Sequence, residues 1–586
     1  MLRKGILYIL CVVFTVSGCS STNEDSDLPT IKESEEEIQE ETPEENEGNQ
    51  VEENVFDGDV TLSSQKEVDD FGSMNVTHVT GSLLIEGNID IADLSPLKSL
   101  QEVGYILRIS NTGIENLKGL DSLTTVQILE IIENPNLTSI SQLNSLTTIN
   151  LNLDILENTE LYSLEGLNKV SKIGGDFTIS GLNTLQSLDG LNGLLSVVGE
   201  FIIRNCENLN SLTGLNKLTQ SGSLAVINNF GLQTLSGLDS FVESGTLNIS
   251  NNTELQSLSA LQSLNVLHGG LNISNNPKIK SLTGLQGLVD VRTCIIRSNA
   301  ELEELVGLDN LTNVDTNLEV SSNPVLVNLD GLNSVAQIGN DLIVNENEKL
   351  NSITGFVSLG AVQGDFMLSN NPKLLALNGL EALSFVRGDF IISNNEALTS
   401  VSSLNSLYII DGSFVIDNND TLVSIIGLNS LLGVGGDMII IDNQSLETID
   451  GFSALTLIEN RLQIQENASL TSIIPLQSLR TISQGLFVQG NQSLGSLLGF
   501  SYLKKVRNTI SISNNPILSS LNGLENLDPF INVPITVEIS NNTILMDLCS
   551  LKNVLNASNE TDIVFSVQEN MFNPTFSDIV SGNCSM

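Results

Sequence analysis

The stretch GDFIISNNEALTSVSSL, residues 388–404, repeats the stretch GDFMLSNNPKLLALNGL, residues 364–380, one period of 24 residues earlier. The same pattern runs along most of the chain, with an asparagine near its centre. In the most regular part these asparagines are Asn276, Asn299, Asn323, Asn347, Asn371, Asn395, Asn419, Asn443, Asn467, Asn491 and Asn515. Self-similarity at a period of this size indicates a solenoid, in which each repeat stacks on the next.

The same position can be assigned outside that regular part. Its occupants there are Asn88, Asn111, Asn134, Asn158, Leu182, Cys206, Asn229, Asn252 and Asn542. With one such residue in each repeat, the sequence predicts about 20 coils of about 24 residues.

The spacing of apolar residues within a repeat predicts strands joined by short bends. Leu271 and Ile273 are two residues apart, which is the spacing of a strand face, whereas Ile279, Leu282 and Leu285 are three apart. No stretch keeps the 3.6-residue period of an amphipathic helix over several turns. We therefore expect an all-β solenoid of parallel strands, roughly 95 Å long at about 4.8 Å per coil.

The recurring asparagine has two interpretations, a structural ladder or a calcium site. A short amide can occupy a tight inward bend and bond to backbone groups of its own coil and of its neighbours. Calcium requires six to eight oxygen ligands, usually including several carboxylates. Most repeats offer no carboxylate at these positions, so the pattern favours the ladder.

The repeat GLxxLxxVxGxLxIxxNxxL resembles receptor L domains, which are leucine-rich-repeat-like β-helical modules, and especially their bacterial surface relatives. The matching residues in one coil are Gly379, Leu380, Leu383, Val386, Gly388, Phe390, Ile392, Asn395 and Leu398. The opening GDVTLSSQKEVDDFG, residues 58–72, is also similar to the entry of the bacterial members. The resemblance covers nearly everything after residue 58 and implies a right-handed solenoid with short parallel sheets. It does not imply a particular ligand.

Both ends of a solenoid need a cap, because an open core and open strand edges invite aggregation. Ser64 and Glu67 have the spacing of a capping box, so we expect a short helix over the first coil. From residue 548 the repeat gives way to a different sequence. The solenoid with its N-terminal cap is thus assigned to residues 58–547, and the C-terminal cap to residues 548–586.

The four cysteines in the solenoid and the C-terminal cap are predicted to be two buried thiols and one disulfide. Cys206 and Cys294 are about four coils apart, far beyond the reach of a disulfide, and are predicted to be buried thiols. Cys549 and Cys584 bracket the C-terminal cap and are predicted to form a disulfide, which an exported compartment permits.

The first 59 residues predict where the protein is located. Residues 1–18 have the form of a secretory signal peptide, with a short basic start and an apolar run too short to span a bilayer. The residues that end in Cys19 resemble a bacterial lipobox, which implies that residues 1–18 are a lipoprotein signal peptide, with cleavage before Cys19 and its lipidation; a soluble secreted protein is the alternative. Residues 19–57 are predicted to be an acidic disordered tether. Its acidic start resembles the surface-export signal of Bacteroidota lipoproteins, so we expect a lipid anchor in the outer membrane, with the chain exposed at the cell surface.

The charge of the chain excludes several classes of partner. The formal net charge is −46, and after residue 59 there are 54 acidic and 21 basic residues, a net charge of about −33. Nucleic acid is excluded as a primary partner, because binding to phosphates requires the opposite sign. No cofactor is expected. The two histidines, His78 and His268, lack a metal-ligand spacing, and no enzymatic site is predicted.

A candidate binding face follows from the register of the coils. In each first strand, the residue between the two inward-facing ones points outward. In five consecutive coils this residue is apolar: Ile343, Met367, Ile391, Val415 and Ile439. The sequence predicts that they form an exposed stripe, which is typical of an interaction site. The alternative is that strand-favouring side chains here only stabilise the sheet, or are partly covered by a loop.

These features together predict a non-enzymatic surface lipoprotein that displays a rigid solenoid for adhesion or ligand binding, with a protein as its partner. One alternative is a structural envelope component or a self-assembling spacer. Another is a glycan-capture lipoprotein, which is less favoured because such sites use aromatic platforms. Aromatic residues make up only 4% of the chain and tryptophan is absent.

Overall fold

The computed structural model describes residues 54–529, 534–556 and 563–586. The chain divides into two units, Met1–Glu52 and Glu53–Met586, and every described residue belongs to the second. The predicted signal peptide, Cys19 and residues 19–53 of the predicted tether lie outside the described residues.

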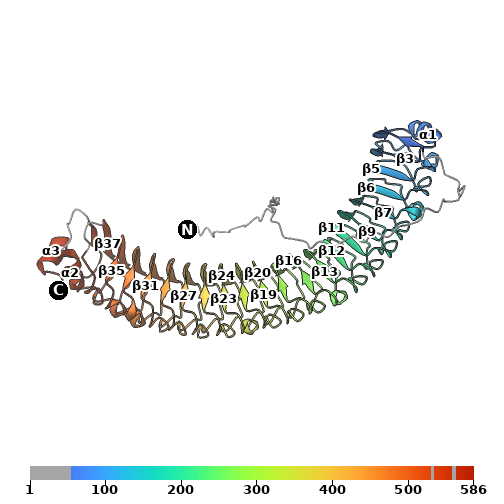
Figure 1. Cartoon of the computed structure of the whole chain (residues 1–586). Coiled ribbons are helices and arrows are strands. Elements are labelled where there is room, and N and C mark those ends of the chain that lie inside the picture. The colour runs from blue at the N-terminus through green and yellow to red at the C-terminus, as the bar shows by residue number, and fades with distance from the viewer. Residues whose placement is uncertain (1–53, 530–533, 557–562) are drawn as a thin grey trace, which may run out of the picture. The chain divides into compact units, whose positions relative to one another are not determined.

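The second unit is a parallel β-solenoid of about 21 turns, as the sequence predicts. Its coils follow one another from α1 (Gln65–Ser73) to α3 (Phe576–Ser581) in Figure 1. The strands belong to one sheet of 28 strands and one of 10 strands. The named strands pair in parallel with strands of neighbouring coils, as β24 (Phe366–Ser369) does with β26 (Phe390–Ser393).

The other strands of the 28-stranded sheet are β1 (Val55–Phe56), β2 (Val60–Leu62), β3 (His78–Val79), β4 (Leu83–Glu86), β5 (Glu102–Ser110), β6 (Thr125–Ile132), β7 (Thr148–Ile149), β8 (Leu153–Leu156), β9 (Lys172–Ile173), β10 (Phe177–Ser180), β11 (Ser196–Arg204), β12 (Gln220–Ile227), β13 (Glu243–Ser244), β14 (Leu247–Ser250), β15 (Val266–Leu267), β16 (Gly270–Ser274), β18 (Thr293–Arg297), β20 (Leu318–Ser321), β22 (Leu342–Asn345), β28 (Phe414–Asp417), β30 (Met438–Ile441), β32 (Leu462–Gln465), β34 (Gly485–Gln489), β36 (Thr509–Ser513), β37 (Ile535–Ser540) and β38 (Ile563–Gln568).

The 10-stranded sheet consists of β17 (Asp290–Val291), β19 (Asn313–Val314), β21 (Gln337–Ile338), β23 (Ala361–Val362), β25 (Phe385–Val386), β27 (Ile409–Ile410), β29 (Gly433–Val434), β31 (Leu457–Ile458), β33 (Thr481–Ile482) and β35 (Lys505–Val506). The remaining helices are α2 (Lys552–Asn556) and the 3-10 turns η1 (Ser95–Leu97), η2 (Ser141–Ser145), η3 (Ser259–Leu261), η4 (Thr354–Phe356), η5 (Ile474–Ser478), η6 (Leu498–Phe500) and η7 (Cys549–Leu551).

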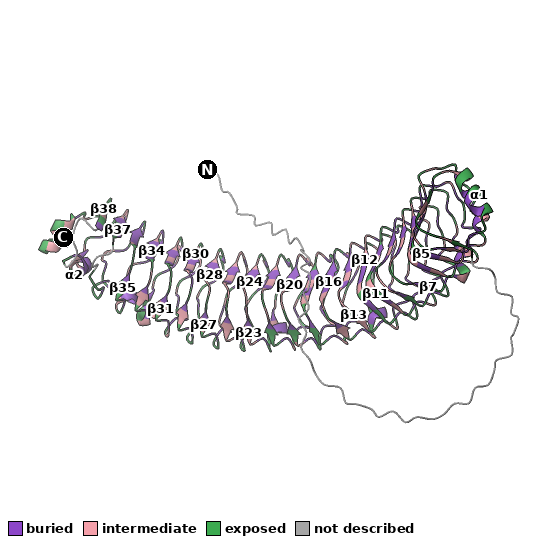
Figure 2. Ribbon diagram, turned by 45° about the horizontal axis from the view of Figure 1, so that its top comes forward, coloured by how far each residue is buried: buried purple, intermediate pink, exposed green. Residues whose placement is uncertain are grey.

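Burial alternates along the four-residue strands from β22 to β32, because successive side chains of a strand point to opposite faces. In β26, Phe390 and Ile392 are buried, whereas Ile391 and Ser393 are intermediate. The same alternation of buried and intermediate residues occurs in β24, β28 and β30, whose positions Figure 2 shows. Inside the solenoid, the rings of Phe366, Phe390 and Phe414 stack at centroid distances of 4.7 and 5.8 Å. The core is therefore a continuous apolar column along the stacked coils.

A ladder of buried asparagines runs beside this core. The Asn395 side-chain oxygen accepts the backbone N–H of Asn371 at 3.1 Å, and its amide nitrogen donates to the Leu368 carbonyl at 3.0 Å. The same oxygen-to-backbone bond, 3.0–3.2 Å long, joins every neighbouring pair of ladder asparagines from Asn252 to Asn542. Each amide thus satisfies two backbone groups at a bend where no strand partner is available.

One coil departs from the assigned ladder. Asn111 was predicted to occupy the ladder position, and this is wrong: Asn111 is exposed with φ 55°, and the buried Thr112 next to it bonds to the Asn134 oxygen. Cys206, by contrast, occupies the ladder position that the sequence assigns to it, and its backbone N–H donates to the Asn229 side-chain oxygen at 3.1 Å. Burial raises the pKa of its thiol to about 12, and backbone hydrogen bonds from Leu182 and Gly181 oppose that shift.

The coils around β6 and β12 have continuous strands where other coils have two. Only two residues separate Val126 from Leu129, whereas three separate Val386 from Phe390. The pairing of β5 with β6, and of β11 with β12, shifts register at the extra residue. The coil of β13 and β14 has the same short connection and keeps two strands, so the length of the connection is not the only cause.

The N-terminal end carries the helix that the sequence predicts. Ser64 caps α1 by accepting the backbone N–H of Glu67 at 3.3 Å, and the Glu67 carboxylate accepts the Ser63 N–H at 2.6 Å. Val68 and Phe71 point into the core. Strand β1 precedes residue 58 and pairs with β3, so the solenoid begins inside the segment that was assigned to the tether.

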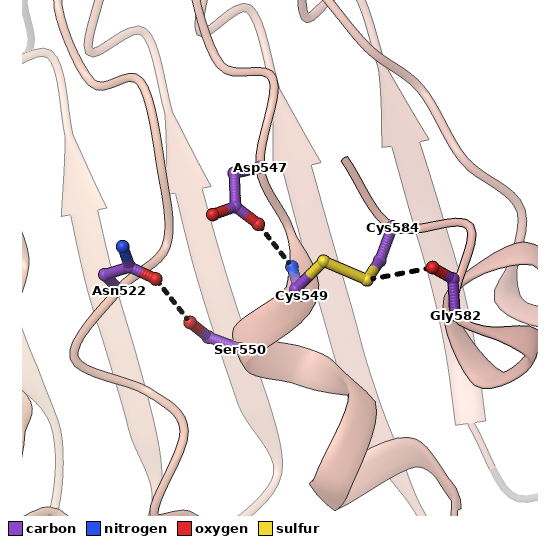
Figure 3. Close-up of a disulfide and its surroundings, with 6 residues drawn as sticks. All are labelled: Asn522, Asp547, Cys549, Ser550, Gly582 and Cys584. Atoms are coloured by element: carbon purple, nitrogen blue, oxygen red, sulfur yellow. Dashed lines mark hydrogen bonds between the residues drawn. A yellow bond between two sulfur atoms is a disulfide. The ribbon is translucent and has the colours of Figure 1, made fainter. Parts of the chain in front are cut away.

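The segment predicted to be only a cap, residues 548–586, contains one more strand of the large sheet. Strand β38 pairs in parallel with β37, and Asn570 extends the ladder by accepting the Asn542 N–H at 3.0 Å. Cys549 and Cys584, 35 residues apart, are joined by a disulfide (Figure 3). This bond ties the last residues of the chain to η7, at the start of the final coil.

Candidate binding face

The predicted stripe, Ile343, Met367, Ile391, Val415 and Ile439, is one continuous row across five adjacent strands. These residues are direct register partners from β22 to β30. We call them the apolar row. On the N-terminal side the next register partner is Glu319 and on the C-terminal side it is Gln463. The row is therefore bounded by a charged and a polar side chain at its two ends.

The apolar row is half-buried, which differs from the exposed stripe that we expected. All five side chains are intermediate in exposure. The reason is the close spacing of parallel strands, about 4.8 Å, which lets each side chain cover the flanks of its neighbours. What the row presents to solvent is a continuous band of side-chain tips.

An unexpected row of aspartates lies immediately before these strands. The Asp341 carboxylate accepts the Asp365 N–H at 2.9 Å, and the Asp365 carboxylate accepts the Asp389 N–H at 2.8 Å. Ser413 and Asp437 continue the pattern, since Asp389 accepts the Ser413 N–H at 2.6 Å and Ser413 accepts the Asp437 N–H at 3.3 Å. We call Asp341, Asp365, Asp389 and Asp437 the aspartate row. Asp341, Asp365 and Asp389 recur every 24 residues in the sequence, and Ser413 takes the next position before Asp437.

On the other side of the apolar row, where the strands end, there is an open groove of about 590 Å³. Its lining residues come from five adjacent coils and are Ser322, Pro324, Glu346, Glu348, Asn370, Pro372, Asn394, Glu396 and Asn418. Glu346 accepts a hydrogen bond from Ser322 at 2.9 Å. The groove is polar and acidic, and it begins one bend beyond the strands of the apolar row.

The groove follows a column of left-handed residues that the sequence pattern did not separate from the ladder. Asn370, Asn394 and Asn418 have φ values of 52–56°, a conformation that asparagine tolerates better than most residues. In the doublet Asn-Asn, the first residue makes the left-handed bend and the second enters the ladder. The signal was present as the recurring doublet SNN.

The remaining candidate residues do not converge on one place. His78 contacts Thr77 at 2.8 Å, and His268 contacts Glu243 at 2.8 Å. Cys206 and Cys294 are buried free thiols. Within the described ranges, no group of three or more His, Cys, Asp and Glu side chains has the geometry to hold a metal ion. None of the helices in those ranges is long and apolar enough to cross a bilayer.

No family model matches this chain, and no curated protein does so. Among solved structures, a complex of TLR13 with ssRNA13 is similar over 83% of this chain and 85% of that chain, at 16% identity and a TM-score of 0.28. A leucine-rich repeat protein from Bacteroides ovatus is similar over 63% of this chain and 83% of that chain, at 14% identity and a TM-score of 0.26. An internalin (InlF) from Listeria monocytogenes is similar over 79% of this chain and 87% of that chain, at 14% identity and a TM-score of 0.20. The fold of this chain rests on its own strand pairing.

Proposed function

We propose that this chain is a non-enzymatic binding protein that holds a protein partner on the apolar row. The observation that carries the proposal is the continuity of the row, since five apolar residues are register partners without a polar interruption. Contiguous apolar surface at the face of a sheet is typical of an interaction site, whereas scattered apolar residues are not. The regular coils on either side make the face rigid, which lowers the entropy lost on binding.

The binding experiment uses the double variant Ile391→Ser and Val415→Ser. Partner capture by the displayed protein is measured by cross-linking on living cells, and we expect it to fall at least about tenfold, since two apolar anchors are lost. The matched control is Ile202→Ser with Ile295→Ser, which changes the same outward position in β11 and β18, outside the row. Equal capture by the two double variants would refute the proposal.

We further propose that the chain is a lipoprotein anchored through Cys19 in the outer membrane and exposed at the cell surface, with an adhesive role. The support is the sequence of residues 1–59: a basic start, a short apolar run, a lipobox-like end and an acidic segment. The Cys19→Ala variant should leave the membrane fraction and lose labelling by a lipid precursor. Retention of both properties would contradict the anchor.

A further inference from the structure

The apolar row lies between two acidic flanks. On the side where the strands begin, the aspartate row places Asp341, Asp365 and Asp389 on adjacent coils, one residue before each strand. On the side where the strands end, Glu346, Asp417 and Asp442 occupy positions directly at or after the last strand residue. This face therefore has an apolar centre with negatively charged side chains on both sides.

The carboxylates of the flanks lack cationic partners. All ion pairs of the described residues lie outside this face, because the residues that form them fall in the part of the sequence from residue 66 to residue 303. Burial raises the pKa of Asp365, and the charges of Asp341 and Asp389 raise it further. Burial also raises the pKa of Asp417, with a contribution from Asp442. The folded protein thus holds crowded negative charge that an added cation would stabilise.

The arrangement excludes several occupants. Anionic lipid and nucleic acid would be repelled by both flanks. A second copy of the chain would meet like charge on a solenoid with a net charge of about −33. A small cation would neutralise the flanks but leave the apolar row uncovered. The occupant must be apolar along its centre and basic along both sides.

The dimensions favour a helix over an added strand. The row belongs to interior strands of the sheet, whose backbone groups are already paired with both neighbours, so no free edge is available for strand addition. Five coils span roughly 20 Å, which equals about 13 residues of α-helix. The flanks are about five strand residues apart, or roughly 16 Å. A helix is about 10–12 Å wide with its side chains, and lysine or arginine side chains can reach the remaining distance.

We propose that the apolar row and its acidic flanks bind an amphipathic helix of a partner protein, with its apolar side on the row and basic side chains over both flanks. This inference rests on the proposed function and specifies the class of partner. The helix would cross the strands along the row, so that its apolar side follows the five coils in order.

The test uses three synthetic helical peptides of about 18 residues with the same leucine pattern. Their other positions are lysine, glutamine or glutamate. Binding to the purified soluble chain is followed by fluorescence anisotropy at about 50 and about 500 mM salt. The lysine peptide should bind at least about tenfold more tightly than the glutamine peptide at low salt, and the glutamate peptide should not bind.

The flank variant is the triple change Asp365→Asn, Asp389→Asn and Glu346→Gln. Each new side chain keeps an oxygen that can accept the same hydrogen bond, so the fold is retained. We expect it to weaken binding of the lysine peptide at least about tenfold.

The charge-matched control is Glu301→Gln, Glu304→Gln and Glu447→Gln, three exposed carboxylates outside the flanks. It should change the affinity less than about threefold, because charges away from the interface are screened. An equal loss in the flank variant and in this control would mean non-specific attraction and would overturn the inference.

A glutamine peptide that binds as tightly as the lysine peptide would also overturn it, while leaving the proposed function of the row intact. The proposed function of the apolar row is tested separately, by the variant Ile391→Ser with Val415→Ser and its control.

Discussion

The side-chain oxygen of Asn395 accepts the backbone N–H of Asn371, one coil earlier, at 3.1 Å. Asn371 accepts the backbone N–H of Asn347 in the same way, so each ladder asparagine bonds to the coil before it through its side-chain oxygen and to the coil after it through its backbone N–H. The ladder therefore couples neighbouring coils through buried polar groups, in addition to the apolar contacts of the core.

Replacing Asn395 with leucine should destabilise the solenoid by about 2–4 kcal/mol, because the Asn371 N–H and the Leu368 carbonyl would lose their partners inside the protein. Urea denaturation followed by circular dichroism gives the shift. The control Asn265→Leu changes an exposed asparagine and should stay within about 0.5 kcal/mol of the parent. Similar midpoints for the two variants would show that the ladder contributes little.

The aspartate row predicts a pH-dependent stability. Burial and neighbouring charges raise the pKa of Asp365 in the folded state, so folding favours its protonated form. Its contribution to stability is fully present below the ordinary value of 3.8 and is lost as the pH rises through the raised folded value. Asp365→Asn should therefore stabilise the protein at pH 7, by about 0.5 kcal/mol, and confer no such gain below pH 3.8.

Thermal melts at several pH values measure this effect. The exposed Asp420→Asn variant serves as control, because its side chain lies outside the aspartate row. A gain from Asp365→Asn that persists unchanged at low pH would contradict the prediction, since no charge would then remain to be removed.

The two free thiols should be inert in the native protein. Burial raises the pKa of both Cys206 and Cys294 to about 12, so almost no thiolate is present at pH 8, and neither sulfur is open to solvent. Iodoacetamide followed by mass spectrometry should label neither residue until denaturant is added. Labelling of either residue under native conditions would indicate local opening of its coil.

Reduction of the disulfide between Cys549 and Cys584 should loosen the C-terminal end. In the unfolded chain this bond closes a loop of 35 residues, so its loss should cost about 3–4 kcal/mol of local stability. We expect faster hydrogen exchange in β38 and unchanged exchange in β24. The double variant Cys549→Ser with Cys584→Ser should reproduce the effect without reductant. Equal protection of β38 in the reduced and oxidised protein would rule out this role.

Much of the fold could be predicted because one constraint repeats. Every coil must bury the same positions and satisfy the same bend, so the spacing of Leu271, Ile273 and Asn276 predicts strand, core and ladder together. The prediction fails where that regularity is weaker. Asn111 and Thr112 are adjacent polar residues, and only the backbone angle shows which one turns inward. Asn570 was missed because its spacing from Asn542 is 28 residues.

The candidate face was predicted only in part. The pattern identified the five apolar residues, since strand alternation sets their direction. It overestimated their exposure, because the cover that parallel neighbours provide depends on packing between coils. It also missed the carboxylates of Asp341, Asp365 and Asp389, which look like ordinary surface charge until the backbone bonds place them in line.

The constant spacing of the ladder has a consequence for how such a chain can change its length. From Asn299 to Asn515 each ladder asparagine follows the previous one by 24 residues, and each bonds only to adjacent coils and to its own bend. Loss or duplication of a whole coil therefore leaves the remaining ladder asparagines in the same register. In-frame recombination between repeats in the gene can thus shorten or lengthen the solenoid in steps of 24 codons while the ladder stays continuous.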